Sequence, residues 1–201
     1  MPRPLLNPAQ VDWSGENPCI YLKETDDGEF VTLATFFRVV WSPHGRGHAC
    51  FLLEAPNAED QSANICLTDN EPLARWLASD FVQHFGAFRQ AVGLRSARYL
   101  PLDRVSPSLE GRRSYTERCH GAGLEVSISW EHLGDAIMVE LPREKSATSK
   151  HEMFSVVVDA QAATVLVNGR QARGKPVPRD FFGHQSTTAF LAFSETWVRV
   201  A

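Results

Sequence analysis

Hydrophobic and polar residues alternate with a period of two along most of the chain, which is the pattern of β-strands. The clearest case is residues 124–130, where Leu, Val, Ile and Trp alternate with Glu and Ser. Such a strand buries one face and exposes the other to water. Residues 30–41 differ because both alternating sets of side chains are mainly apolar, so a strand there must be covered on both faces.

Polar and glycine-containing segments separate the predicted strands. Asp26-Asp27-Gly28 precedes residues 30–41, and Asn168-Gly169 is the signature of a tight hairpin, because both residues tolerate positive φ. These turns predict strands connected in antiparallel fashion. The other predicted strands cover residues 20–24, 49–54, 64–68, 136–141, 153–159, 164–168, 171–173 and 187–200.

Helical periodicity is confined to one segment, which begins after the polar residues Thr68-Asp69-Asn70. Pro72 falls in the predicted first turn, where its missing amide hydrogen would be unpaired in any case. One stripe of the helical wheel is apolar except for a histidine: Leu73, Leu77, Phe81, His84 and Phe88. The pattern predicts a long amphipathic helix that ends before Gly93.

About ten strands and one long helix predict a mainly antiparallel β protein, with an α+β arrangement as the alternative. Several strands are apolar on both faces, and one helix covers only part of a sheet. We therefore expect a barrel-like or strongly bent sheet. The 201 residues are expected to form a single domain. Residues 1–18 hold four of the twelve prolines and are expected to form an irregular arm on its surface.

Composition and charge exclude several classes of protein. A hydrophobic content of 43% argues against intrinsic disorder. The formal net charge of −4, from 20 basic and 24 acidic residues, lacks the basic character of a nucleic-acid-binding protein. The longest apolar stretch, residues 30–41, is shorter than the roughly 20 residues of a membrane helix. The first eight residues also lack the apolar run of a secretory signal. We therefore expect a cytoplasmic protein with no nucleic-acid or membrane partner.

Sequence motifs for common cofactors fail on inspection. The glycines of Gly45-Arg46-Gly47 precede a predicted strand and lack the third glycine of a dinucleotide-binding loop. His44 and His48 lack the His-x-His spacing that places two ligands on one strand face, so no metal site is predicted. The four cysteines contain no Cys-x-x-Cys pair and are expected to be reduced and mostly buried. The sequence identifies no cofactor.

Two charged residues stand within predicted apolar faces. Arg38 lies inside the doubly apolar segment 30–41, and Glu195 lies between Phe193 and Trp197 on its predicted face. A charge in such a place costs several kcal/mol unless it is paired or faces a polar cavity. The pattern allows two interpretations. One is an ion pair between strands. The other is a ligand-binding interior, where arginine holds an anion and the carboxylate orients a polar group or moves a proton.

Three further residues complete the candidate site. The segment Arg179-Asp180-Phe181-Phe182-Gly183-His184 combines acid, imidazole and aromatic side chains in a predicted loop, where binding residues collect. Asp180 and His184 are therefore candidates, and so is His48. Either histidine would be available for proton transfer in an enzyme.

The sequence thus predicts a β-barrel domain that binds a small apolar or amphipathic molecule through Arg38, Glu195, His48, Asp180 and His184. One alternative is an enzyme on the same barrel, of the lyase, isomerase or hydratase type. Another is a flavin-binding split barrel. The 20 aromatic residues also leave a homo-oligomer open.

Overall fold

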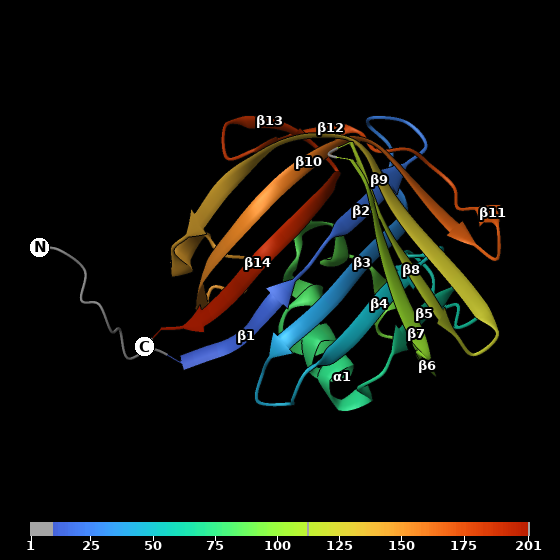
Figure 1. Cartoon of the computed structure of the whole chain (residues 1–201), viewed down its shortest axis with the longest axis horizontal. Coiled ribbons are helices and arrows are strands. Elements are labelled where there is room, and N and C mark those ends of the chain that lie inside the picture. Colours follow the sequence, from blue (N-terminus) through green and yellow to red (C-terminus); the bar gives the residue numbers. More distant parts are fainter. Residues whose placement is uncertain (1–9, 112, 201) are drawn as a thin grey trace, which may run out of the picture.

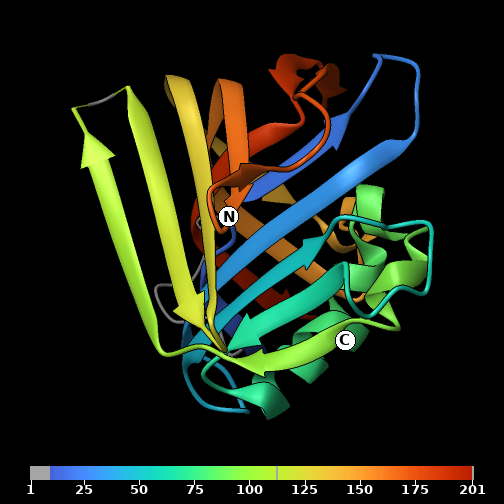
Figure 2. The same cartoon turned by 90° about the vertical axis from the view of Figure 1, so that its right-hand side faces the viewer.

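The computed structural model describes residues 10–111 and 113–200. Its main feature is a sheet of twelve strands, bent so strongly that its two halves face each other (Figures 1 and 2). Within the described residues the hydrogen-bonded path ends at β6 and β7, which do not pair with each other. Of the two expected forms, a barrel-like or a strongly bent sheet, the structure shows the strongly bent sheet, because the sheet does not close into a barrel. The expectation of a mainly antiparallel β protein is confirmed.

The strands follow one another in the order β6-β5-β4-β3-β1-β14-β10-β9-β8-β7, with β2 beside β3 and β14 and β11 beside β10. Their bounds are β1 (Gln10–Glu16), β2 (Cys19–Lys23), β3 (Phe30–Trp41), β4 (Gly47–Leu53), β5 (Asn64–Thr68), β6 (Arg98–Pro101), β7 (Arg104–Glu110), β8 (Ser114–Gly121), β9 (Leu124–Leu141), β10 (His151–Val167), β11 (Arg170–Gln171), β12 (Pro178–Phe181), β13 (His184–Thr187) and β14 (Ala189–Arg199). Strands β12 and β13 form a separate hairpin. Only the pair β5 and β6 is parallel among the described strands.

Strand β1 corrects the expectation of an irregular arm over residues 1–18. It pairs with β14 on one side and β3 on the other, and the Trp13 side chain is fully buried. Gly15 allows β1 to cross between its two neighbours, because a Cβ there would lie 2.0 Å from the carbonyl oxygen of Arg38. The burial of the Trp13 ring stabilises an ordered strand here, although prolines are frequent in this part of the chain. Residues 1–9 lie outside the described residues.

The helix is shorter than the periodicity predicts. Helix α1 (Glu71–Asp80) begins at Asn70, whose side chain accepts a hydrogen bond from the Leu73 amide over 3.1 Å. It ends where Phe81 leaves helical geometry, with φ of −128°. Three short 3₁₀ turns follow: η1 (Val82–His84), η2 (Gly86–Phe88) and η3 (Val92–Leu94). A fourth, η4 (Arg143–Lys145), lies between β9 and β10. Beyond residue 80, the apolar spacing therefore indicates residues that are buried and does not indicate an α-helix.

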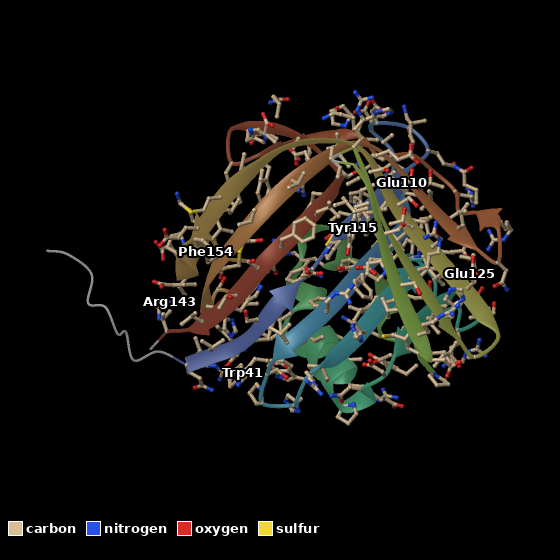
Figure 3. The ribbon with its side chains drawn as sticks, viewed as in Figure 1. Trp41, Glu110, Tyr115, Glu125, Arg143 and Phe154 are labelled. Carbon is tan, nitrogen blue, oxygen red and sulfur yellow. The ribbon has the colours of Figure 1, made fainter. Side chains whose placement is uncertain are left out.

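The bent sheet buries two hydrophobic clusters, one on each face. The first lies against α1 and the 3₁₀ turns and includes Trp13, Phe37, Phe51, Phe81 and Trp197. The second lies between the facing halves of the sheet, where side chains fill the space (Figure 3), and includes Phe36, Leu52, Ile128, Trp130 and Leu191. Strand β3 contributes to both clusters, as the doubly apolar pattern of residues 30–41 predicts.

The long strands β9 and β10 bend from one cluster to the other. Residues near the start of β9, such as Ile128, pack between the sheet halves, and Leu141 at its end packs on the helical side. At this bend, the pairing of β10 with β9 shifts its register between Val158 and Ala160. Each strand was predicted from sequence as two short ones, because the bend interrupts the alternation.

Two other expectations are met. All four cysteines are buried, and none of them forms a disulfide bond. The hairpin at residues 168–169 has positive φ at both positions. No helix within the described part of the chain is long and apolar enough to cross a membrane.

Candidate functional site

A cavity of about 710 Å³ lies on the helical side of β2 and β14. The 3₁₀ turns, the connection between β9 and β10, and strand β12 form its walls. Its lining is rich in large apolar side chains: Phe30, Phe85, Leu141, Met153, Phe181, Phe190 and Trp197. Its volume and apolar lining are typical of small-molecule sites. We call it the Glu195 cavity.

A β-bulge in β14 turns Glu195 into this cavity. Phe154 of β10 pairs with Thr196 and Val156 pairs with Phe193, so two residues of β14 oppose one residue of β10. Ser194 accommodates the extra residue with φ of 53°. Bulges of this kind re-aim side chains and occur often beside active sites.

The bulge corrects the predicted common face of Phe193 and Glu195. Phe193 points between the sheet halves, where its ring packs edge-on against Tyr115 with the ring centres 5.8 Å apart. Glu195 and Trp197 line the cavity on the opposite face. A simple alternation of period two cannot foresee this reversal, because one extra residue exchanges the two faces.

Glu195 is 5% exposed, and its carboxyl group has one hydrogen-bond partner among the described residues. Trp197 Nε1 donates a hydrogen bond to Glu195 Oε1 over 2.6 Å. Burial raises the pKa of Glu195 to about 8, and the Trp197 hydrogen bond opposes this only in part. Glu195 is therefore mostly protonated at neutral pH. Because Oε1 accepts the tryptophan hydrogen, the proton belongs on Oε2, which has no partner among the described residues.

Arg179 supplies the cationic group of the cavity. Its guanidinium lies over the rings of Phe181 and Phe190, with its carbon 4.8 Å and 4.4 Å from the ring centres. Its Nε and Nη2 atoms are buried, and no described residue accepts a hydrogen bond from either. Burial lowers the pKa of Arg179, and the nearby Asp159 opposes this shift. An arginine in this setting has desolvated donors that lack an acceptor.

The sequence pattern does not single out Arg179, although it belongs to the same segment as Asp180 and His184. The signal was present, because Arg179 stands two residues before an aromatic pair. Its second aromatic neighbour, Phe190, comes from another strand, and the sequence alone does not bring the two together.

The structure gives Asp180 and His184 local roles in the β12 and β13 hairpin. Asp180 lines the cavity rim, and its Oδ1 accepts a hydrogen bond from the Gly183 amide over 3.0 Å. His184 Nε2 lies 2.9 Å from Asp159 Oδ2, and Ser186 Oγ donates to Asp159 Oδ1 over 2.6 Å. The carboxylate lies between the hydroxyl and the imidazole, so this group lacks the order of a Ser-His-Asp relay. It fastens the hairpin to β10.

Arg38 lies in an ion-pair network away from the Glu195 cavity. Its Nε donates to Glu16 Oε2 over 3.0 Å, and its Nη2 donates to Glu117 Oε1. Glu117 is fully buried between the sheet halves and also accepts a hydrogen bond from the Tyr115 hydroxyl. The structure thus places Arg38 in an ion pair between strands, and it does not bring Arg38 and Glu195 to one ligand.

His48 belongs to the same network. Its Nε2 lies 3.2 Å from Arg38 Nη1, and its Nδ1 lies 2.7 Å from Asp69 Oδ2. Arginine only donates, so Nε2 must accept and Nδ1 carries the hydrogen donated to Asp69. Both ring nitrogens are therefore engaged. No group of three or more His, Cys, Asp or Glu within residues 10–111 and 113–200 is placed to hold a metal ion.

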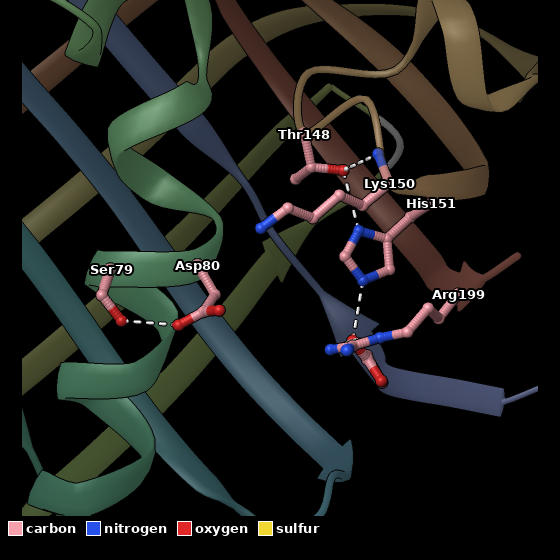
Figure 4. Close-up of polar contacts among 7 residues, drawn as sticks. Ser79, Asp80, Thr148, Lys150, His151 and Arg199 are labelled. Atoms are coloured by element: carbon pink, nitrogen blue, oxygen red, sulfur yellow. Dashed lines mark hydrogen bonds and ion pairs between the residues drawn. The ribbon is translucent and has the colours of Figure 1, made fainter. Parts of the chain in front are cut away.

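A buried histidine network, shown in Figure 4, ties β1 to β10 and β14. His151 lies 2.7 Å from Thr148 Oγ1 through Nδ1 and 2.7 Å from Asp12 Oδ2 through Nε2. Asp12 also accepts a hydrogen bond from Arg199 Nη2 over 2.6 Å. The order of hydroxyl, imidazole and carboxylate resembles a nucleophile relay. However, Thr148 and His151 are buried and neither lines the Glu195 cavity, so their role is to hold the strands together.

A depression of about 570 Å³ beside α1 holds three more arginines, Arg75, Arg89 and Arg95. Arg75 pairs with Glu71 over 2.7 Å and lies over the Tyr99 ring. All three arginine side chains are exposed to water, which solvates their charge without a ligand. Arg179 differs because its donors are buried.

The chain matches no family model, no curated protein and no solved structure. The chemistry of the Glu195 cavity is therefore the guide to function.

Proposed function

We propose that the protein binds a small amphipathic molecule, with its anionic head group on Arg179 and its apolar body in the Glu195 cavity. The observation that carries the proposal is the buried edge of the Arg179 guanidinium, where Nε and Nη2 lack an acceptor. These two N–H groups lie side by side on one edge of the guanidinium and match the two oxygens of a carboxylate once the side chain turns this covered edge toward the cavity.

The energetics of Arg179 favour an occupied site. Burying donors without partners costs about 1–3 kcal/mol for each group, and more for a charged one. A ligand carboxylate removes this cost and adds two charge-assisted hydrogen bonds. The guanidinium carbon lies 4.8 Å and 4.4 Å from the ring centres of Phe181 and Phe190, and these contacts limit its motion. Arg179 is therefore held beside the cavity before a ligand arrives.

The charges around the cavity select an anion over a cation. Lys23, Arg89 and Lys145 lie at its rim. Protonation of Glu195 removes the negative charge from its interior. Two carboxylates lie at the rim. Asp26 pairs with Lys175 over 3.1 Å, and Asp180 accepts a hydrogen bond from the Gly183 amide. The apolar lining then favours a ligand with an aliphatic or aromatic body, whose burial contributes roughly 25 cal/mol per Å².

The test compares three probes with the same chain: dodecanoate, dodecanol and dodecylamine. Isothermal titration should show that the purified protein binds the acid at least about tenfold more tightly than the alcohol or the amine. Arg179→Met should remove this preference. Arg170→Met is the matched control, because the Arg170 side chain is 61% exposed and is not part of the cavity lining. Equal affinity for acid and alcohol, or unchanged acid binding in Arg179→Met, would show the proposal to be wrong.

Catalysis of proton transfer in the same cavity is a second candidate. The carboxyl group of Glu195, whose pKa is near 8, lies in the range expected of a general acid or base. His48 and His184 do not line the cavity, so Glu195 would carry the proton in an isomerase, lyase or hydratase. Turnover of a bound ligand, lost in Glu195→Gln and rising or falling with an apparent pKa near 8, would favour this candidate over binding alone.

A further inference from the structure

We infer that the ligand of the Glu195 cavity carries a second polar group, an uncharged carbonyl or hydroxyl oxygen that accepts a hydrogen bond from the Glu195 carboxyl. The ligand class is then a carboxylic acid with an oxygen substituent along its apolar body. This inference rests on the proposed function, because Arg179 is taken to hold the acid head.

The geometry around Glu195 leaves one donor directed at the cavity. Trp197 Nε1 donates a hydrogen bond to Oε1 over 2.6 Å, and no described residue forms a hydrogen bond with Oε2. Glu195 itself lines the cavity while being 5% exposed. The O–H of its protonated carboxyl therefore meets either cavity water or a ligand atom. An apolar ligand would leave this donor unpaired, and an oxygen acceptor would satisfy it.

Most other polar groups in the cavity are already satisfied by the protein. Asn17 Nδ2 donates to Thr35 Oγ1 over 2.7 Å and to Phe36 O over 3.3 Å. Thr188 Oγ1 donates to Tyr21 O over 2.6 Å. Tyr21 also lines the cavity, and its hydroxyl, which interacts with the Cys19 thiol, is another uncharged group able to donate to a ligand. Tyr21→Phe is therefore the necessary control for Glu195.

The second ligand group is uncharged for an electrostatic reason. A second carboxylate is less well served, since Arg179 is the lining cation with buried donors that lack an acceptor, and Lys23, Arg89 and Lys145 lie at the rim. An ammonium group would require Glu195 to ionise, and burial opposes that. A carbonyl or hydroxyl oxygen accepts the proton of Glu195 without adding charge.

The experiment measures the affinities of dodecanoate and of a series of dodecanoates with a keto group at successive positions along the chain. At pH 6.5 the protein should bind at least one keto acid about tenfold more tightly than dodecanoate, which is the effect of one good hydrogen bond. Glu195→Gln should keep this preference, because the amide accepts from Trp197 through its oxygen and donates to the ligand through its nitrogen. Glu195→Leu should reduce the preference for the keto acid over dodecanoate to less than twofold.

Circular dichroism and thermal melting establish that each variant is folded before its affinity is interpreted. At pH 9.5 the preference should disappear in the native protein and persist in Glu195→Gln, since only the former loses a donor. Cys19 and Tyr21 from β2 interact electrostatically with Glu195, and the other titratable or charged residues that line the cavity are Lys23, Asp26, Arg89, Lys145, Arg179 and Asp180. Burial raises the pKa of Cys19 to about 12 and the pKa of Tyr21 well above its usual value, so neither thiol nor phenol ionises in this range.

Three outcomes would overturn the inference. If dodecanoate binds through Arg179 but no keto acid binds more tightly, the inference fails and the proposed function stands. If Glu195→Leu weakens dodecanoate as much as the keto acids, Glu195 contacts the acid head and no second oxygen is needed. If Tyr21→Phe removes the preference and Glu195→Leu retains it, the donor is Tyr21. Failure of every acid to bind the native protein would overturn the proposed function as well.

Discussion

Ser194, with φ of 53°, precedes Glu195 in the bulge of β14 and directs the carboxyl into the cavity instead of the space between the sheet halves. This backbone detail connects the fold to the site. Before and after the bulge, the side chains of β14 alternate regularly between the two faces of the sheet. The extra residue reverses which face the later side chains occupy. Glu195 therefore shares its face with Trp197 but not with Phe193.

The bulge predicts how β14 responds to substitution at Ser194. A residue other than glycine is strained at positive φ, and a β-branched one is strained most. Ser194→Val should lower the free energy of unfolding by about 1–2 kcal/mol, whereas Ser194→Gly should leave it unchanged or raise it by less than ~1 kcal/mol. The Ser194 side chain is exposed, so lost packing does not explain a difference. Urea unfolding measures both, and a valine variant as stable as the native protein would contradict the bulge.

Glu195 predicts a specific dependence of stability on pH. The unfolded chain loses the Glu195 proton near 4.5, and the folded protein loses it near 8. Between these values the folded state binds one more proton than the unfolded state, so stability falls as pH rises. Above about 8 both states are ionised and the change is complete. A shift of this size amounts to ~5 kcal/mol at about 1.4 kcal/mol per pKa unit, which is an upper limit.

Glu195→Gln should remove this part of the pH dependence. Urea unfolding at pH 5 and pH 8 should show a loss of stability of up to ~4 kcal/mol in the native protein and a smaller loss in the variant. Glu152→Gln, an exposed position on β10, controls for the loss of a carboxylate elsewhere. Parallel pH profiles for the native protein and Glu195→Gln would show that the carboxyl is not protonated in the folded state.

The Arg38 and Glu117 pair predicts a loss of stability that is independent of ligand binding. Glu117 is fully buried, so Arg38→Leu leaves its charge uncompensated and should cost about 3–5 kcal/mol. Replacing both residues, as in Arg38→Leu with Glu117→Leu, should recover most of this cost. Dodecanoate affinity should stay within twofold of native in the folded double variant. Weaker binding in that variant would place Arg38 in the ligand site after all.

Local patterns in the sequence were sufficient for most strands. Residues 30–41 and 64–68 were predicted with the bounds that β3 and β5 have, because alternation and turn residues act over short distances. The hairpin of β7 and β8 was missed, since its half-exposed strands carry little apolar alternation. The bend of the sheet was expected from total burial, but its failure to close depends on strand order, which no local pattern contains.

The site could be predicted only in part for a similar reason. Arg38 and Glu195 give the same sequence signal, a charge on an apolar face. What separates them is Glu117, which is 79 residues from Arg38 in the chain and pairs with it across the two sheet halves. Arg179 lies in a segment without periodicity, and its burial follows from packing against Phe190 of another strand. Partners distant in sequence therefore decide which charged residue meets a ligand.

The hydrogen bonds of Asp159 lead us to expect that the hairpin carrying Arg179 controls ligand release. The Asp159 carboxylate accepts hydrogen bonds from Ser186 over 2.6 Å and from His184 over 2.9 Å, and so fastens β12 and β13 to β10. Ser186→Ala removes one of these bonds without changing charge and should loosen the hairpin. Amide hydrogen exchange over residues 178–187 should then accelerate while exchange in β3 stays unchanged. The dissociation rate of dodecanoate should rise by about tenfold, because Arg179 is held less firmly. Faster exchange with an unaltered dissociation rate would show that the hairpin does not hold the ligand.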